Sequence, residues 1–153
     1  MGRRCRGYTL IELIVAITIV AICVSTLLGV IAAVASRSAD AVLEQQAIAI
    51  AQAYLGEIEQ RWVVDPNGTL PNTGRANWDT VGQYNGLSES PHDQFGNAIT
   101  VNGIPVLTAY TVNVAVVQST ALPGITAANA RRIDVTVTTP NVSVKLSGYR
   151  TNY

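Results

Sequence analysis

Glu12 is a lone carboxylate directly before an uncharged apolar stretch of 24 residues, Leu13–Ser36. A stretch of this length is sufficient to span a bilayer, which takes about 20 residues. An ionisable side chain in a membrane helix is costly, about 2.5 to 3.5 kcal/mol for Asp at the helix centre, and it almost always pairs with another group. The chemistry that this position offers is therefore an ion pair. We expect a cation from outside the helix to meet Glu12.

Residue types suited to catalysis are sparse in the rest of the chain. The region after the apolar stretch has one histidine, His92, and no cysteine, so it offers neither a His/Cys metal cluster nor a thiol nucleophile. No Gly-x-Ser-x-Gly, P-loop or Gly-x-Gly-x-x-Gly motif occurs. The carboxylates of Asp79, Glu89 and Asp93 leave calcium binding as an alternative, without a spacing specific to that ion. We predict that the protein is not an enzyme and has no cofactor and no metal site.

A short basic leader precedes Glu12. Met1–Gly7 carries three arginines, and the small Gly7 stands directly before the aromatic Tyr8. Glu12 is the fifth residue after Gly7, and the residues around it are Thr9, Leu10, Ile11 and Leu13. This arrangement closely resembles the N terminus of the type IV pilin family, in which a basic leader ending in Gly precedes an aromatic residue, Thr-Leu-Ile-Glu-Leu and a long apolar helix. The family usually has Phe where this chain has Tyr8, so the aromatic ring is retained.

The resemblance implies a processing site and an assembly site. Prepilin peptidase would cut between Gly7 and Tyr8, recognising the motif over 9–13, and the new amine of Tyr8 would be N-methylated. In the assembled filament, the carboxylate of Glu12 would form a salt bridge with the Tyr8 amine of a neighbouring subunit. The partners implied are prepilin peptidase, other pilin subunits, the inner-membrane assembly platform and the lipid bilayer.

The N terminus has two other possible interpretations. A secretory signal peptide has an apolar region of about 7 to 15 residues before an Ala-x-Ala site, and Ala33-Val34-Ala35 offers such a site. The 23 residues of Leu13–Ala35 are too many for that region. A plain membrane anchor for a periplasmic enzyme explains the length but not the residues from Gly7 to Glu12.

The same features predict three parts and a location. We expect a cleaved leader over 1–7, a transmembrane and filament-core helix over 8–36, and a periplasmic or extracellular globular pilin domain over 37–153. Arginines in the leader keep the N terminus in the cytoplasm. The precursor is thus predicted to cross the bacterial inner membrane once, and later to reach a pilus at the cell surface or a periplasmic filament.

Charge and cysteine content bear on the partners and the stability of the globular domain. Removing the three leader arginines from ten basic residues leaves seven against ten acidic ones, a net charge of about −3. A nucleic-acid-binding surface would be markedly basic, so we expect no nucleic-acid partner. Cys5 lies in the leader and Cys23 in the apolar stretch, which leaves no disulfide for the exported domain. Many pilins have one, and we expect this domain to rest on packing alone.

The helix is predicted to continue past the membrane segment as far as about Val64, before Pro66. One apolar stripe at spacings of three and four runs along this second half, and its members are Leu43, Ala47, Ile50, Ala51, Tyr54, Leu55, Ile58 and Trp62. Gly29 interrupts the first half and is either a weak point in the helix or a site of close helix packing.

The segment over 65–97 is predicted to be a long connecting loop with one or two short turns. Within it, Trp78–Leu87 resembles a segment of minor pilins of the mannose-sensitive haemagglutinin (MSHA) type, the D-type subunit in particular. Those proteins tend to be more acidic where this chain has Thr80, Gly82 and Gln83. We expect Trp78, Tyr84 and Leu87 to form a satellite core under the loop.

The C-terminal third, over 98–153, is predicted to form a sheet. Asn102-Gly103 indicates a type I′ hairpin between 99–101 and 104–106. Apolar and polar residues alternate over 110–116, 133–138 and 142–147, which is typical of half-buried antiparallel strands. The stripe on the helix is the partner available for the apolar face. We therefore predict an α+β fold, with a long N-terminal helix on a sheet of three or four antiparallel strands, as in pilins.

The resemblance favours a structural minor pilin of an MSHA-like type IV pilus, also because of the ending over 149–153. A minor pseudopilin of a type II secretion system is the alternative that shares the whole N-terminal argument. A pilus-borne adhesive or DNA-uptake module is an alternative of another class. It requires a binding surface, for which Arg131, Arg132 and Arg150 are candidates at the open end of the last hairpin.

Overall fold

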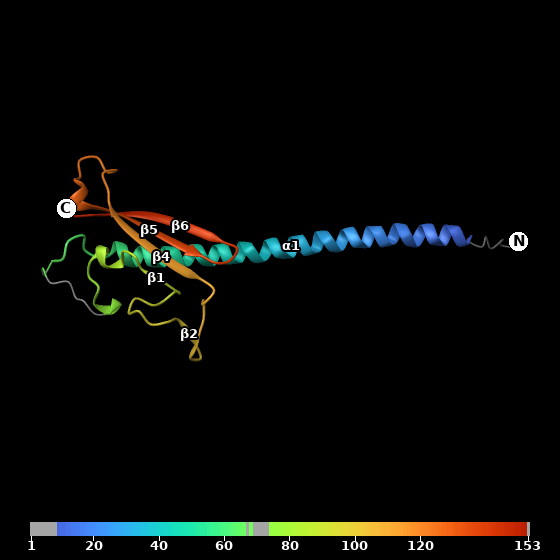
Figure 1. The fold of residues 1–153 in the computed structure, drawn as a ribbon, viewed down its shortest axis with the longest axis horizontal. Helices are drawn as coiled ribbons and strands as arrows, with labels where there is room; N and C mark the ends of the chain where they lie inside the picture. Colours follow the sequence, from blue (N-terminus) through green and yellow to red (C-terminus); the bar gives the residue numbers. More distant parts are fainter. Residues whose placement is uncertain (1–8, 67, 69–73, 153) are drawn as a thin grey trace, which may run out of the picture. The chain divides into compact units, whose positions relative to one another are not determined.

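The computed structural model describes residues 9–66, 68 and 74–152, and it divides into two compact units, one up to Ala41 and one from Val42. A single helix, α1, comprises Leu10–Glu59 and contributes to both units (Figure 1). The two units are described separately below.

In the first unit, α1 exposes its apolar side chains on every side. Each residue from Thr9 to Ala41 whose burial is described is exposed. Several hydroxyl groups of this part donate to carbonyls three or four residues earlier, as Thr18 does to Val15 at 2.8 Å and Ser25 to Ile22 at 2.8 Å. Such bonds pair these donors within the helix, as a hydrocarbon environment requires. In the described part of the chain, α1 is the one helix long and apolar enough, by length and composition, to cross a membrane.

The second unit is built on a four-stranded antiparallel sheet, in the order β1-β4-β5-β6. Its strands are β1 (Ser88–Glu89), β4 (Thr111–Gln118), β5 (Ala130–Thr138) and β6 (Ser143–Thr151). β4 pairs antiparallel with β5 and β5 with β6; the segment over 119–129, which contains the 3-10 helix η3 (Ala127–Asn129), connects β4 to β5, and a short turn connects β5 to β6. The buried side chains of β4 alternate as predicted. The structure confirms the α+β, pilin-like fold.

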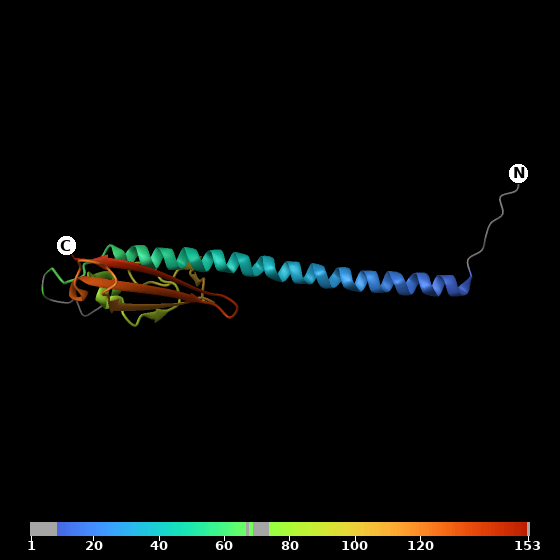
Figure 2. The same ribbon diagram turned by 90° about the horizontal axis from the view of Figure 1, so that it is seen from above.

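The last turns of α1 supply the layer that covers this sheet (Figure 2). Ala47, Ala51 and Ile58 are fully buried against the sheet, together with Tyr54. Gly148 of β6 permits this close approach, because a Cβ at that position would lie 2.9 Å from Cδ1 of Leu55. The predicted stripe therefore faces the sheet up to Ile58.

The helix ends earlier than predicted, at Glu59 instead of about Val64. After a last turn, the backbone N–H of Trp62 donates to the carbonyl of Asp79 at 2.9 Å, and the Trp62 carbonyl accepts from Val81. The chain thus pairs with the 79–81 segment in place of continuing α1. Trp62 was predicted to lie in the buried stripe, and this is wrong: its exposed fraction is 54%, and Val63 is buried instead.

The segment over 65–97, where the structure describes it, holds more structure than the sequence predicts. It contains two 3-10 helices, η1 (Arg75–Asn77) and η2 (Val81–Tyr84), and then β1, which joins the main sheet. Tyr84 is fully buried in the central core, and Trp78 and Leu87 pack against it. These residues therefore belong to the main core and not to a satellite. Irregular backbone gives burial no fixed period, so the sequence pattern does not reveal it.

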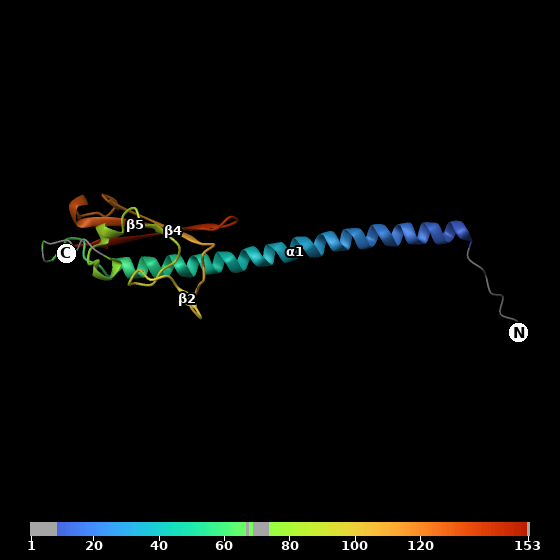
Figure 3. The ribbon, with the colours of Figure 1, turned by 60° about the horizontal axis from the view of Figure 1, so that its bottom comes forward.

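The predicted hairpin is present, but it forms a separate two-stranded sheet of β2 (Thr100–Val101) and β3 (Ile104–Pro105). Asn102 and Gly103 have φ values of 52° and 78°, as a type I′ turn requires. The hairpin stands away from the main sheet (Figure 3). Its place in the main sheet is taken by β1.

Candidate functional site

The first turn of α1 contains a reciprocal pair of hydrogen bonds between Thr9 and Glu12. The backbone N–H of Thr9 donates to Oε2 of Glu12 at 3.5 Å, and the N–H of Glu12 donates to Oγ1 of Thr9 at 3.4 Å. This is a capping box, which satisfies two of the amide donors left open at a helix start. Sequence reasoning missed it, although the Thr-x-x-Glu spacing before an apolar run is its signal. Both bonds are longer than the typical value of about 3.0 Å, and only the bond from the Thr9 N–H involves the carboxylate, so it is held only weakly.

The structure brings the described residues of the processing motif together on the first turns of α1. Leu10, Ile11 and Leu13 are exposed beside Thr9 and Glu12. The predicted cleavage and methylation positions, Gly7 and Tyr8, lie outside the described residues. In the described part of the chain, no Lys or Arg forms an ion pair with Glu12. Its carboxylate therefore has a helix-capping role in the chain, and no described cation.

A second carboxylate of α1, Glu57, is paired within its own unit. Nη2 of Arg75 lies 2.9 Å from its Oε2, and Nε of Arg75 donates to its Oε1 at 3.3 Å. Arg75 also contacts Glu89 through Nη1, and its side chain is only 4% exposed. The hydroxyl of Tyr84 donates to Oε1 of Glu57 at 2.7 Å. One buried guanidinium thus joins α1, η1 and β1.

Two tyrosine rings complete this cluster. The guanidinium carbon of Arg75 lies 4.6 Å from the ring centroid of Tyr54, which is within cation–π range. The Tyr54 hydroxyl donates to Glu89 at 2.9 Å and accepts the backbone N–H of His92 at 2.8 Å. The side chain of His92 is half-buried beside this bond. Gly96 covers the cluster at φ 84°, where a Cβ would lie 3.1 Å from Cβ of Arg75.

Burial and the ion pairs shift the pKa values of the cluster. Burial, and then the hydrogen bond to Glu57, raise the pKa of Tyr84 to about 12. Burial also raises the pKa of Tyr54 above its ordinary value, against the opposing effect of Arg75. For Arg75, burial alone would lower the pKa, but the hydrogen bonds to Tyr54 and Glu57 outweigh it and raise the pKa. The phenols stay neutral and the guanidinium stays charged across the physiological range.

The segment that resembles MSHA-type minor pilins is held together by internal bonds. Oε1 of Gln83 accepts from the backbone N–H groups of Asp79 and Thr80, both at 2.9 Å, and caps η2. The rings of Trp78 and Tyr84 meet edge to face, with centroids 4.8 Å apart. These residues shape the core under the segment.

The calcium alternative finds no site among the described residues, since no three His, Cys, Asp or Glu side chains gather there. Glu89 is occupied by Arg75. Asp93 accepts the backbone N–H groups of Phe95 at 2.9 Å and Asn97 at 2.8 Å, which lowers its pKa. Two of the carboxylates considered for calcium, Glu89 and Asp93, thus form bonds within the fold itself.

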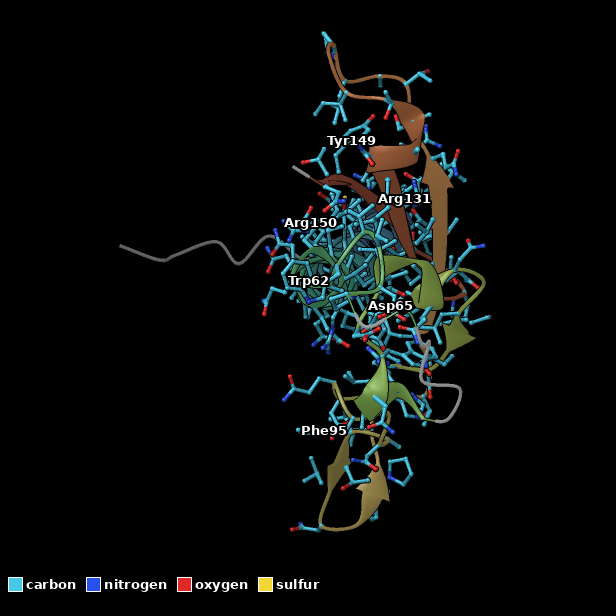
Figure 4. The ribbon with its side chains drawn as sticks, turned by 90° about the vertical axis from the view of Figure 1, so that its left-hand side faces the viewer. Trp62, Asp65, Phe95, Arg131, Tyr149 and Arg150 are labelled. Atoms are coloured by element: carbon cyan, nitrogen blue, oxygen red, sulfur yellow. The ribbon has the colours of Figure 1, made fainter. Side chains whose placement is uncertain are left out.

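The three arginines considered for a binding surface do not form an open basic cluster. Arg131 and Arg150 are opposite each other in the β5–β6 register, near the end of α1 (Figure 4). Arg131 donates to the carbonyls of η3, as at 3.1 Å to Ala127, while Nε of Arg150 donates to the Arg61 carbonyl at 3.1 Å. Arg132 pairs with Asp134 at 3.0 Å. The guanidinium group of each arginine therefore interacts with another part of the same unit.

Comparison with known proteins identifies the N-terminal feature. The family model described as the prokaryotic N-terminal methylation motif matches residues 2–28. No curated protein matches the chain, and no solved structure does. The motif indicates a prepilin of the type IV pilin and pseudopilin class, which is structural and not an enzyme class. It implies processing by prepilin peptidase and assembly with other pilins, and with the apolar helix it fits anchoring in the inner membrane before assembly.

Proposed function

We propose that this chain is a structural minor pilin of an MSHA-like type IV pilus. One observation carries the proposal: the methylation motif leads into an apolar helix, exposed on every side, whose Glu12 has no described cation in its own chain. A helix that is apolar all round is suited to lipid or to other helices. In the filament, the helices of neighbouring subunits surround this apolar helix.

The parts of the chain take separate roles in this proposal. The leader over 1–7 is removed after Gly7, and Tyr8 becomes the methylated N terminus. The helix over 8–36 anchors the precursor and then forms the filament core, while the domain over 37–153 remains outside. Glu12 then pairs with the Tyr8 amine of a neighbour. Breaking a buried ion pair costs about 3 to 5 kcal/mol, so the pair also favours one axial register between subunits.

The intact mass of the protein extracted from membranes tests the processing step. We expect a chain that starts at Tyr8 and is heavier by one methyl group. A chain that starts at Ser36, after Ala33-Val34-Ala35, would establish the signal-peptide interpretation and end the proposal. A chain that retains Met1 would show that the motif is not processed.

A minor pseudopilin of a type II secretion system remains the second candidate, because the motif serves both classes. The Trp78–Leu87 segment and the ending over 149–153 favour the pilus. Recovery of the chain in filaments sheared from the cell surface supports the pilus. Normal surface filaments without this chain, together with a secretion defect on its deletion, would support the pseudopilus.

A further inference from the structure

A groove in the second unit lies between α1 and the segment over 91–99. Its larger part has a volume of about 510 Å³ and is lined mostly by polar side chains. Its smaller part, of about 200 Å³, adjoins the first, since Ala53, Glu57 and Gln94 line both. From Ile50 to Gln60 the groove follows the helix for about 15 Å, at about 1.5 Å per residue. An elongated site of this length suits an extended chain of about five residues.

The larger part of the groove contains a cation that lacks a counter-ion in the described part of the chain. Among the described residues, Arg61 forms no ion pair, whereas Arg75 of the same unit forms two. Nε of Arg61 is buried and has no hydrogen-bond partner. Arg61 lowers the pKa of Tyr84 against the larger effect of burial, but this phenol is neutral at pH 7 and does not compensate the charge. Because guanidinium groups bind carboxylates through two parallel hydrogen bonds, Arg61 offers a site for a carboxylate of a ligand.

Three side-chain amides also line the larger part of the groove. Gln52 and Gln60 lie on the helix side, and Gln94 lies on the turn opposite, and all three residues are exposed. Asp93 holds this turn with two backbone hydrogen bonds of 2.9 and 2.8 Å, so Gln94 is positioned before a ligand binds. A Gln amide both donates and accepts, and each residue of an extended peptide presents one N–H and one C=O. The amides are therefore suited to the main chain of a peptide.

Gly56 lines the groove on the helix side, next to the amides. Gly is less favourable in a helix than Ala. A Cβ at this position would meet no atom within 4 Å, so packing inside the unit does not require a glycine here. The absence of a side chain keeps the centre of the groove open, and there the main chain of a ligand can approach α1.

The smaller part of the groove is lined mostly by apolar atoms. Ile50 of α1 lies there with Pro91 and Ile99 of the opposite segment. It has room for one apolar side chain, which gains free energy by leaving water. A saccharide carries hydroxyl groups throughout and gains little from such a surface. The apolar part therefore favours a peptide over a saccharide as the ligand.

We propose that this groove binds an extended acidic segment of another protein. A carboxylate of the segment pairs with Arg61, and the main chain bonds to the glutamine amides. An apolar side chain about four residues from the carboxylate occupies the smaller part of the groove. The inference goes beyond the proposed function, because it assigns a partner to the globular unit and requires neither processing nor filament assembly.

Photo-cross-linking in cells that produce the full chain tests the groove. The photoreactive amino acid p-benzoylphenylalanine replaces Gln52 at the rim, and mass spectrometry identifies the peptide that is linked on irradiation. We expect one main protein product, linked within a segment that has an Asp or Glu about four residues from an apolar residue. The same amino acid in place of Ser143, an exposed residue of β6, is the control and should not give this product.

Two substitutions connect the product to the groove. Gly56→Leu fills its centre at a position with free space, so the unit should fold and most of the product should be lost. Arg61→Gln should lower the product about tenfold, which is the scale of one charge-assisted hydrogen bond. Ala49→Leu, at an exposed position of α1 outside the groove, is the matched control for Gly56→Leu and should leave the product unchanged. The amount of chain in membranes shows that each variant is stable.

A synthetic peptide of the linked segment then tests the ion pair. Its binding to the detergent-solubilised full chain should weaken about tenfold with Arg61→Gln, and by a similar factor when the carboxylate of the peptide is replaced by an amide. Because both changes remove the same ion pair, their combination should weaken binding little further. Additive effects of the two changes would exclude the pairing with Arg61.

Three other outcomes overturn the inference. The first is the absence of a product at Gln52 that the Ser143 control lacks. The second is a product that persists in both Gly56→Leu and Arg61→Gln. The third is a link to a second copy of this chain, or to lipid or saccharide without a peptide. Each of these leaves the proposed function intact, because processing and entry into filaments are measured separately.

Discussion

Glu12 and Glu57 are carboxylates on the same helix, and their surroundings differ. Glu57 is held by Arg75 at 2.9 Å and by Tyr84 at 2.7 Å, all in one unit. Glu12 accepts a long bond from the backbone of Thr9 and has no described cation. The apolar side chains follow the same division, since Ala47, Ala51 and Ile58 are buried while those from Leu10 to Val34 are exposed.

The contrast separates the apolar side chains and charges that gain partners when the chain folds from those that do not. The second unit covers its own apolar stripe and pairs its buried Arg75 and Asp134 with opposite charges. Among the described residues, the first part of α1 does neither, and we expect lipid or other subunits to be its partners. Substitutions near Glu57 should therefore change the stability of the globular unit, and substitution of Glu12 should not.

Arg75→Ala is expected to have the largest effect on stability. It leaves the carboxylates of Glu57 and Glu89 without their cation in a largely buried site, and breaking such a pair costs about 3 to 5 kcal/mol. Urea unfolding of the fragment over 36–153, followed by tryptophan fluorescence, measures this. Arg132→Ala is the matched control, because the Arg132 side chain is 44% exposed and Asp134 keeps Lys145 as a second cation, so we expect a loss of at most about 1 kcal/mol. Equal effects of the two substitutions would contradict a stabilising role for the buried ion pairs of Arg75 with Glu57 and Glu89.

Ile58→Ala tests the apolar side of the same contact. Ile58 is fully buried between α1 and the sheet, and truncation of a core side chain costs about 2 to 5 kcal/mol. Val42→Ala, at an exposed position on α1, is the control and should have little effect. An unchanged unfolding midpoint for Ile58→Ala would show that the helix-on-sheet core is wrong.

Tyr84→Phe should have a smaller effect that depends on pH. It removes the hydroxyl bond to Glu57, which contributes about 1 to 3 kcal/mol. The pKa of Tyr84 rises on folding from about 10 to about 12, so the neutral phenol stabilises the folded unit fully below pH 10. That stabilisation is lost as the pH rises toward 12. The wild-type fragment should thus lose stability more steeply than Tyr84→Phe between these pH values, and parallel curves would exclude this role.

Much of the fold could be predicted from the sequence because its main elements have regular periods. Spacings of three and four identified the buried face up to Ile58, alternation identified β4, and Asn102-Gly103 identified the hairpin turn. The prediction failed at Trp62, where backbone pairing with the 79–81 segment competes successfully with continuation of the helix. No local pattern shows a partner that lies so far along the chain.

The candidate site, too, could be predicted only where a local sequence pattern indicates it. Glu12 is visible as a charge before an apolar run, and the methylation motif covers it. Arg75 is a single arginine in an irregular segment, and nothing in its neighbours indicates burial. Its partners Glu57 and Glu89 are 18 and 14 residues away. The expectation that the domain rests on packing alone was therefore incomplete, since a buried ion-pair cluster also fastens the connecting segment.

Glu12→Ala tests the central claim most directly, with Glu44→Ala, at an exposed carboxylate further along α1, as its matched control. The measurement is the amount of processed chain in membranes and in sheared surface filaments. We predict that both variants are cut after Gly7 as in the wild type, and that Glu44→Ala enters filaments normally. Glu12→Ala should enter them at about a tenth of the wild-type level or less, since loss of even 1.4 kcal/mol is a tenfold change. Recovery of Glu12→Ala in filaments at wild-type abundance would contradict the claim that Glu12 receives its cation from a neighbouring subunit.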